Sequence, residues 1–258
     1  MAYVELRGHP TWYQPAKGRG KSVVLLHGGL SSSTSLWHSI GPGLRKHFRV
    51  SAFDRRGHGR SADTDQPFSI DAMAEETVAF LEHLGTRSHL VGHSDGANVA
   101  LAVAMRRPDL VRRVVAVGGN FHYSGLMAME PFTPQSPGFG DFAQDFAAKS
   151  PDGLAHAALV VEKTRVLIEN EPNWTVDDLA TISRPVLVMA GDDDVTTIAH
   201  VGAMFEAIPN AQLAILPGAS HGVLKEHTQV ATSMIVHFLK STLPPVTRAP
   251  IRRKVAGA

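Results

Sequence analysis

Short runs of hydrophobic residues recur along the chain, and turn-forming residues bound each run. The runs are brief and rich in β-branched residues, so they predict buried strands. Their apolar positions are continuous rather than alternating, which is typical of strands covered on both faces in a parallel sheet. The predicted strands cover residues 22–27, 48–54, 89–93, 111–118, 185–191 and 211–217.

Amphipathic segments lie between these strands and predict helices. In the second of them, Ile70, Met73 and Leu81 fall on one face. Alternating strands and helices predict an α/β fold, with a mainly parallel sheet and helices on both faces. Residues 2–6 and 11–14 predict an antiparallel pair at one edge. The predicted helices cover residues 36–47, 70–84, 97–107, 197–208 and 223–239.

The alternation is interrupted from residue 121 to residue 184. This stretch combines a loop rich in Pro, Gly and Phe with helical patterns near 141–149 and 153–169. It predicts a helical cap inserted into a core formed by residues 1–120 and 185–242. The aromatic and Met side chains of the insert either form its own core or line an apolar pocket, and both interpretations stay open. Residues 243–258 predict a basic, flexible tail.

Composition narrows the possible partners. The 258 residues carry a formal net charge of +1, which is too small to attract nucleic acid or an anionic membrane, so we expect a small-molecule substrate. The absence of cysteine excludes disulfides, thiolate catalysis and cysteine-based zinc sites. The chain has neither a signal-peptide pattern nor an apolar stretch long enough to span a membrane, which favours a cytoplasmic protein. The oligomeric state stays open.

The sequence G-H-S-D-G at residues 92–96 directly follows a predicted strand and precedes a predicted helix. So abrupt a turn forces Ser94 into a strained conformation with an exposed hydroxyl. Glycine at positions 92 and 96 avoids collisions there, and the helix start directs N–H groups toward an oxyanion. This context predicts that Ser94 is a nucleophile rather than a simple helix N-cap.

A serine hydroxyl needs a nearby base to act as a nucleophile at neutral pH. Among fourteen histidines, His221 follows a predicted strand in the small-residue loop L-P-G-A-S-H-G. Three aspartates at residues 192–194 follow another predicted strand. Serine, acid and histidine in this chain order, each after a strand, predict a catalytic triad. The pattern alone leaves open which of the three acids belongs to it.

These motifs, with H-G-G at residues 27–29 and D-R-R-G-H-G-R-S at 54–61, resemble those of the α/β-hydrolase fold family. The resemblance extends from residue 3 to about residue 239. It implies that Asp194, three residues after Gly191, is the acid of the triad. It also implies that residues 121–184 correspond to the family's cap.

The resemblance further implies an oxyanion hole formed by the main-chain N–H groups of Gly29 and Asp95, with Leu30 as the alternative to Gly29. His27 is expected to brace this loop rather than to act as a base. Turn-stabilising roles, not catalytic ones, are expected for Asp54, Arg55, His58 and Ser61.

The implied function is hydrolysis of a carboxylic ester of a small to medium substrate, with no metal or organic cofactor. Relatives that open epoxides or displace halide use an aspartate nucleophile, whereas this chain has Ser94. The motifs do not separate esterases from lactonases, amidases or enzymes that cleave carbon–carbon bonds. A ligand receptor of the same fold with little turnover is a further alternative.

The side chain of Asp95 differs from the hydrophobic residue that is often found beside the nucleophile. A carboxylate facing the pocket would disfavour an oxyanion and would favour substrates that carry an ammonium group. Alternatively, the side chain points away and stabilises the helix start.

Overall fold

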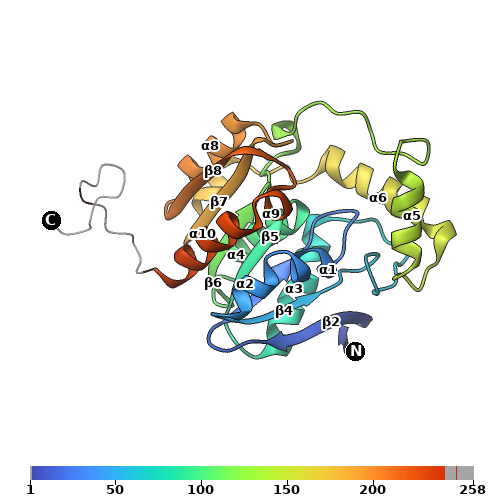
Figure 1. Cartoon of the computed structure of the whole chain (residues 1–258), viewed down its shortest axis with the longest axis horizontal. Coiled ribbons are helices and arrows are strands. Elements are labelled where there is room, and N and C mark those ends of the chain that lie inside the picture. The colour runs from blue at the N-terminus through green and yellow to red at the C-terminus, as the bar shows by residue number, and fades with distance from the viewer. Residues whose placement is uncertain (1, 242–247, 249–258) are drawn as a thin grey trace.

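A single twisted sheet organises the part of the chain that the computed structural model describes, residues 2–241 and 248 (Figure 1). Its strand order is β1-β2-β4-β3-β5-β6-β7-β8. The pairs β1–β2 and β2–β4 are antiparallel, and the other neighbouring pairs are parallel. The strands are β1 (Ala2–Leu6), β2 (His9–Lys17), β3 (Ser22–Leu26), β4 (Arg49–Phe53), β5 (Ser88–His93), β6 (Val111–Val117), β7 (Val186–Asp193) and β8 (Ala211–Ser220).

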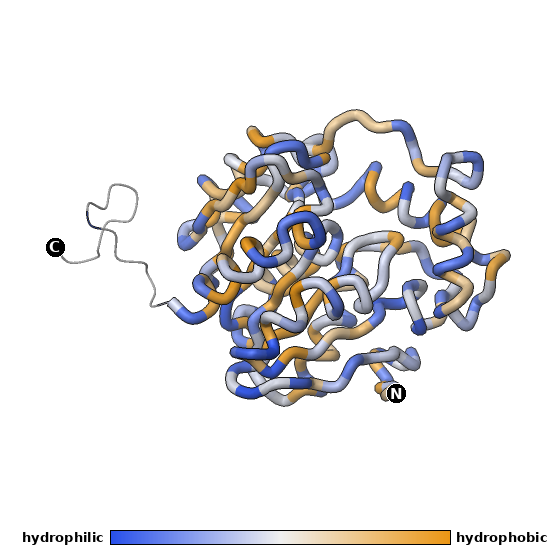
Figure 2. Tube along the Cα trace, in the orientation of Figure 1, coloured by the Kyte–Doolittle hydropathy of each residue, from blue (hydrophilic) through white to orange (hydrophobic). Residues whose placement is uncertain are grey.

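Both faces of the sheet are covered, as the continuous apolar runs predict. Successive side chains of a strand point to opposite faces. In β3, Val24 and Leu26 accordingly belong to one hydrophobic core, whereas Val23 and Leu25 belong to a second. Figure 2 shows hydrophobic residues concentrated along the central strands. The predicted mainly parallel α/β sheet is confirmed, including its antiparallel edge.

Helices divide between the two faces. The first core contains residues of α3 (Ile70–Leu84), α4 (Asp95–Arg106) and α8 (Ile198–Ala207), together with residues of the three α-helices in the segment from 121 to 184. The second core is filled from the other face of the sheet. Its helices are α1 (Ser33–His38), α2 (Gly41–Arg45), α9 (Val223–Glu226) and α10 (Thr228–Lys240).

The predicted helix over residues 36–47 is wrong as a single element. The structure has two short helices there, and α2 begins with Gly-Pro-Gly. Pro42 has no N–H to donate, and its ring collides with the carbonyl four residues earlier in a continuous helix. Two flanking glycines weaken helix formation further.

The predicted helix over residues 223–239 is also interrupted. His227 has φ −118° and ψ 42°, outside the helical range, and separates α9 from α10. The hydroxyl of Thr228 donates to the carbonyls of Leu224 and Lys225, at 2.9 and 3.0 Å, and so satisfies the carbonyl groups at the end of α9.

The segment from 121 to 184 leaves the sheet after β6 and returns at β7 (Figure 1). Helical structure is present near both predicted pieces, and a further short helix, α7, was not predicted. Its elements are η1 (Tyr123–Gly125), α5 (Phe139–Ala147), η2 (Leu154–His156), α6 (Ala157–Asn170) and α7 (Val176–Ala180). The predicted tail, residues 243–258, lies outside the described residues apart from position 248.

One buried carboxylate ties this insert to the loop after β4. The side chain of Asp63 is 1% exposed, and it accepts hydrogen bonds from Lys163 at 2.6 Å and from His156 at 3.0 Å. Burial by itself would raise the pKa of Asp63, but these two hydrogen bonds hold it below its ordinary value. The main-chain N–H of Asp63 also donates to Asp152 at 2.8 Å. Helix α6 is therefore anchored by charge as well as by packing.

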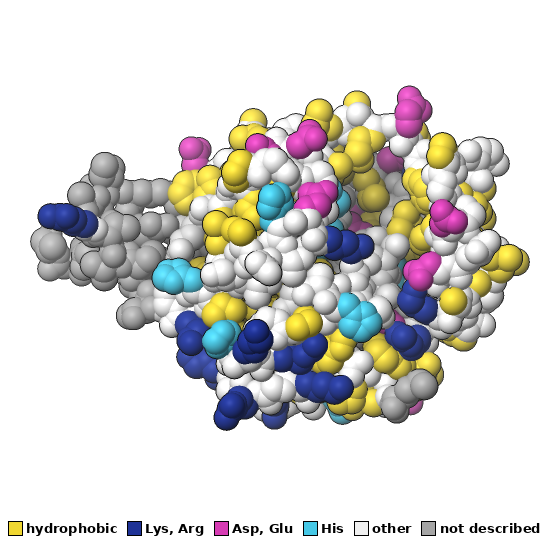
Figure 3. All heavy atoms as spheres, in the orientation of Figure 1, with side chains coloured by type: hydrophobic (Ala, Val, Ile, Leu, Met, Phe, Trp, Pro, Cys, Tyr) yellow, Lys and Arg dark blue, Asp and Glu magenta, His cyan; other side chains and the backbone are white. Residues whose placement is uncertain are grey.

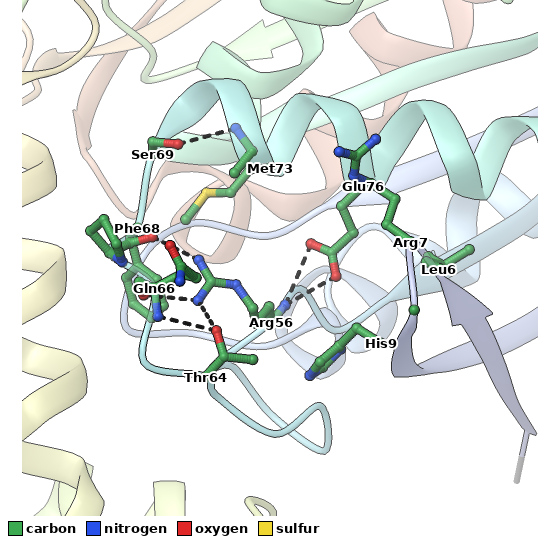
Figure 4. A pocket seen from close by; sticks show the side chains of 13 residues that line it. Leu6, Arg7, His9, Arg56, Thr64, Gln66, Phe68, Ser69, Met73 and Glu76 are labelled. Atoms are coloured by element: carbon green, nitrogen blue, oxygen red, sulfur yellow. Dashed lines mark hydrogen bonds between the residues drawn. The ribbon is translucent and has the colours of Figure 1, made fainter.

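The loop after β4 is itself held by Arg56, beside a cavity of about 440 Å³ (Figure 4). Its guanidinium donates to the hydroxyl of Thr64 at 2.6 Å and to the carbonyls of Gln66 and Pro67 at 2.9 and 2.7 Å. Its main-chain N–H donates to the carboxylate of Glu76 on α3 at 3.2 Å. These contacts join the loop to itself and to α3.

The turn-stabilising contacts expected for this motif are present. The carboxylate of Asp54 accepts from the main-chain N–H groups of Ser33 at 2.8 Å and Arg60 at 3.0 Å. The hydroxyl of Ser61 donates to the carbonyl of Asp54 at 2.5 Å. Asp54 at the start of this loop is thus hydrogen-bonded to Arg60 and Ser61 at the end of the D-R-R-G-H-G-R-S motif.

Glu76 makes the stability of the protein depend on pH. Burial raises the pKa of its carboxyl to about 7, against the charge of Arg55 and the hydrogen bond from Arg56, which lower it. Between about pH 4.5, where an unfolded glutamate ionises, and about pH 7, the folded state holds a proton that the unfolded state has released. The contribution of Glu76 to the free energy of unfolding therefore falls as pH rises through this window. Glu76→Gln should flatten this part of the curve in urea denaturation.

The exposed neighbour Glu75, which pairs with Arg7 at 2.8 Å, provides the control. Glu75→Gln should keep the wild-type decline between these pH values. Identical pH curves for wild type and Glu76→Gln would contradict the prediction.

Candidate active site

Ser94 lies at the turn between β5 and α4 in a strained backbone conformation. Its φ is 55° and its ψ is −126°, in a region that L-residues rarely adopt. Its N–H donates to the carbonyl of Val117 at 2.8 Å, and its carbonyl accepts from Ala97 at 2.7 Å. The strand-to-helix turn predicted from the sequence is therefore present, held by β6 on one side and by α4 on the other.

Two glycines make this turn possible. A Cβ atom on Gly92 would lie 2.0 Å from the carbonyl oxygen of Gly96. A Cβ atom on Gly96 would lie 2.1 Å from the carbonyl oxygen of Leu26, at the end of β3. Both distances are far below van der Waals contact. The predicted reason for glycine at these positions is thus confirmed.

Asp194 and His221 meet across the ends of β7 and β8. The Oδ1 atom of Asp194 lies 2.6 Å from Nδ1 of His221. The side chain of Asp194 is fully buried, whereas that of His221 is 30% exposed. Since Nδ1 is occupied by the carboxylate, Nε2 is the nitrogen that is left for a nucleophile or substrate. Ser94 and His221 line the same cavity, whose volume is about 270 Å³.

The environment of Asp194 favours its charged form. Burial alone would raise its pKa, but the hydrogen bond and charge of His221 outweigh burial and lower it. The N–H groups of Thr196 and Gly191 approach the same carboxylate at 3.4 Å and act in the same direction. An ionised Asp194 can hold the imidazole in one tautomer and stabilise its protonated form.

The two neighbouring aspartates do not reach the histidine. Asp192 and Asp193 are exposed, and Asp192 accepts a hydrogen bond from the N–H of Ala219 at 3.2 Å, which links the ends of β7 and β8. Of the three candidate acids, the structure therefore brings only Asp194 to His221.

The loop after β3 that carries the proposed oxyanion donors, residues 27–30 (the oxyanion loop), passes directly beside Ser94 and the start of α4. A Cβ atom on Gly28 would lie 3.0 Å from Cβ of Ser94, and one on Gly29 would lie 2.5 Å from Oδ2 of Asp95. Asp95 is the first residue of α4, where an N–H has no acceptor within the helix. Gly29, Leu30 and Ser94 line one cavity. The structure thus brings together Gly29, Leu30 and Asp95, whose main-chain N–H groups are expected to form an oxyanion hole.

The side chain of Asp95 does not face the cavities beside the site, and its carboxyl lies in the first turn of α4, which fits the alternative in which it stabilises the helix start. It lines neither of these two cavities. It is buried behind Gly29 and Thr164 instead. Burial raises the pKa of this carboxyl, although the charges of Arg55 and His221 oppose the rise. This placement does not support a preference for ammonium substrates.

His27 braces the oxyanion loop, as the resemblance implies. Its Nε2 accepts from the N–H of Arg55 at 3.2 Å, so the ring proton belongs on Nδ1, which lies 2.7 Å from the carbonyl of Gly28. Burial and the neighbouring Arg55 lower the pKa of His27 well below its ordinary value. A neutral imidazole with both nitrogens occupied is not available as a base.

Two contributors to the site were not predicted from the sequence. The Nε2 atom of His93 lies 2.8 Å from the carbonyl of His221, and burial lowers the pKa of His93 to about 4, so a neutral ring holds the loop that carries His221. Gly118, with φ 58°, directly follows β6, and a Cβ atom there would lie 3.0 Å from the ring of His221 and 3.2 Å from Asp194. For Gly118, the only signal in the sequence was a glycine at the end of a predicted strand.

A second cavity adjoins the first across Leu30, which lines both. It measures about 520 Å³ and lies between the oxyanion loop and the insert. Figure 3 shows hydrophobic side chains gathered around a hollow on this face of the molecule. Four phenylalanines of the insert contact one another, so its aromatic residues both form a small core and line a pocket. The apolar lining consists of Leu30, Tyr123, Leu126, Met127, Met129, Pro131, Phe132, Val161 and Ile168.

The described part of the chain contains neither a cluster of metal-ligating side chains nor a helix suited to a membrane. Within residues 2–241 and 248, no three His, Asp or Glu side chains are grouped so that they could hold a metal ion. In the same part of the chain, no helix has the length and apolar character needed to cross a membrane.

Residues 23–232 match the alpha/beta hydrolase family. The chain is 30% identical to "Putative carbamate hydrolase RutD" of Caulobacter sp. (strain K31), over 92% of this chain and 95% of that protein. It is 28% identical to the pimeloyl-[acyl-carrier protein] methyl ester esterase of Aeromonas hydrophila, over 86% and 96%. The enol-lactonase from Burkholderia xenovorans LB400 superposes with a TM-score of 0.75 at 22% identity, covering 93% and 100%. The chain belongs to the alpha/beta hydrolase family, and its relatives support hydrolase activity.

Gly118→Ala should separate positioning of His221 from general backbone strain. The added Cβ would press on the imidazole and on Asp194, so hydrolysis should slow by about tenfold. Alanine at a positive φ should also destabilise the fold by about 1 kcal/mol. The measurements are the rate of ester hydrolysis and the thermal unfolding midpoint.

Gly85→Ala is the matched control. Gly85 has φ 62°, and a Cβ atom there would meet nothing within 4 Å. It should lower the unfolding midpoint by a similar amount and leave the rate unchanged. Equal rates for both variants and wild type would show that Gly118 does not position the pair.

Proposed function

We propose that the protein is a serine hydrolase that cleaves a carboxylic ester, or a related acyl bond, of a small to medium substrate through an acyl-enzyme. The observation that carries the proposal is the 2.6 Å contact between His221 and a buried Asp194, at a cavity that the strained Ser94 also lines. A serine, an imidazole and a carboxylate arranged in this order are the components of nucleophilic acyl transfer.

In the proposed mechanism, the hydroxyl of Ser94 attacks the substrate carbonyl and His221 takes its proton through Nε2. Asp194 holds the imidazole by Nδ1 and stabilises its positive charge. The N–H groups of Gly29 and Asp95 donate to the oxyanion of the tetrahedral intermediate, with Leu30 as the alternative donor. His221 then protonates the leaving group. Water, deprotonated by the same histidine, cleaves the acyl-enzyme and regenerates Ser94.

The two adjoining cavities suggest how a substrate is placed. The cavity beside Ser94 is the smaller, at about 270 Å³, and the cavity under the insert is larger and mostly apolar, at about 520 Å³. Volumes in this range suit small molecules rather than polymers. We therefore propose that residues 121–184 act as a cap, and that an apolar part of the substrate lies against Met127, Phe132 and Val161.

The relatives support acyl chemistry. The names of the two curated relatives refer to a carbamate hydrolase and to a methyl ester esterase. Both names refer to substrates with a carbonyl group that carries an oxygen substituent. An ester or carbamate is therefore the substrate class to examine first, before a carbon–carbon bond substrate.

Ser94 should be labelled rapidly by an organophosphonate or by phenylmethylsulfonyl fluoride, because only a serine with a working base reacts quickly. Peptide mapping should place the adduct on Ser94, and Ser94→Ala should not react. A panel of p-nitrophenyl esters should be turned over by wild type and not by Ser94→Ala. Labelling of another serine, or none, would refute the proposed nucleophile. A single slow acylation without turnover would point to a ligand receptor instead.

Asp194→Asn should lower kcat by on the order of 10³–10⁴, because the amide favours the wrong imidazole tautomer. Asp192→Asn and Asp193→Asn serve as matched controls, since they remove the same charge within two residues. Each should change kcat by less than about tenfold. A large loss in either control with little loss in Asp194→Asn would show that Asp194 is not the acid of the triad.

A further inference from the structure

Two ionisable side chains, Arg55 and Asp95, are buried directly behind the oxyanion loop. Arg55 has no exposed surface, and Asp95 is 7% exposed. Arg55 comes from the loop after β4 and Asp95 from the first turn of α4, so they approach the loop from different elements. Burying an isolated charge is strongly unfavourable unless a compensating charge lies nearby.

Arg55 holds the loop at Gly28. Its Nη2 donates to the carbonyl of Gly28 at 3.4 Å. Its main-chain N–H donates to Nε2 of His27, whose Nδ1 bonds to the same carbonyl at 2.7 Å. The residue therefore acts on Gly28 both directly and through His27.

Asp95 holds the next residue of the same loop. Its Oδ2 lies so close to Gly29 that a Cβ atom there would be 2.5 Å away, and Thr164 of α6 closes the space at 3.1 Å. The carboxyl thus packs against one proposed oxyanion donor, while the main-chain N–H of Asp95 is the other.

The two side chains make no direct contact with each other. Oδ2 of Asp95 and Nε and Nη1 of Arg55 have no hydrogen-bond partner among the described residues, and the pair is not within ion-pair distance. Burial lowers the pKa of Arg55, and the charge of Asp95 is the largest influence that opposes this effect, ahead of Glu76 and Asp54. Burial raises the pKa of Asp95, and Arg55 is the largest opposing influence there, ahead of His221. Two opposite charges that do not touch still attract each other strongly in a low-dielectric interior.

We infer that Arg55 and Asp95 form a buried electrostatic couple that positions the oxyanion loop, with Arg55 acting through Gly28 and Asp95 through Gly29. Both are positioning residues, because neither side chain lines the cavity with Ser94. The inference rests on the proposed function and extends it, since the resemblance assigns Arg55 only a role in the turn. Removing one member leaves the other charge buried and uncompensated, which displaces the loop. Removing both restores neutrality.

The test is a double-mutant cycle on the full-length protein with Arg55→Met, Asp95→Asn and the double variant. The readouts are the rate of Ser94 labelling by an organophosphonate, kcat and KM for one p-nitrophenyl ester, and the unfolding midpoint. Each single variant should label and turn over at least about tenfold more slowly at a temperature where it remains folded, with KM little changed. The double variant should be no slower than the worse single variant, which gives a coupling of about tenfold.

Two further variants keep the inference falsifiable. Arg55→Lys retains the cation and should keep rates within about threefold of wild type. Arg56→Met removes the neighbouring charge, which contacts Thr64, Gln66 and Pro67 instead of the oxyanion loop, so it should lower stability without changing the labelling rate. If Arg55→Met does not fold, Asp95→Asn and Arg55→Lys still give opposite expected outcomes.

The possible failures are distinguishable. Normal labelling of wild type on Ser94, with rate losses that simply add in the double variant, would overturn the couple and leave the proposed function intact. Variants that lose stability but label at the wild-type rate would do the same, because they would show a structural role only. A wild type that is not labelled on Ser94 would overturn both.

Discussion

The close approach of α4 to the end of β3 is the constraint on which the site depends. At Gly96 the helix lies so near the carbonyl of Leu26 that only hydrogen fits between them. This contact fixes the start of α4 against the loop that follows β3, and it leaves Ser94 at a positive φ between the two. The surrounding sheet holds this strained conformation, because the carbonyl of Val117 in β6 accepts a hydrogen bond from the N–H of Ser94.

The parallel sheet explains why residues more than a hundred positions apart form one centre. The carboxyl ends of β3, β5, β7 and β8 lie at the same edge, and each contributes one part: the oxyanion loop, the serine, the acid and the histidine. Continuous hydrophobic strands form two cores that hold this edge rigid. The polar loops can therefore be placed accurately although they are exposed on one side.

Much of this arrangement could be predicted from the sequence, because local patterns determine it. Apolar runs indicated the strands, and the glycines around Ser94 indicated the turn. The breaks at Pro42 and His227 were missed because an amphipathic pattern continues across them. The contacts of His93 and Gly118 with the catalytic loop could not be predicted, since they depend on strands meeting in space. For the same reason, the sequence could not decide where the side chain of Asp95 points.

The anchoring of α6 through Asp63 has a consequence for how substrates reach the serine. Lifting the helix would separate Lys163 and His156 from a carboxylate that is almost completely buried. That separation would break both of these hydrogen bonds and leave Asp63 paired with Arg56 alone, at 3.5 Å. We therefore expect molecules to enter and leave past the exposed edge of His221 and the rim of the insert, while α6 remains in place as a fixed wall. Turnover would then be limited by diffusion through a permanent opening or by chemistry, and not by a gating motion of this helix.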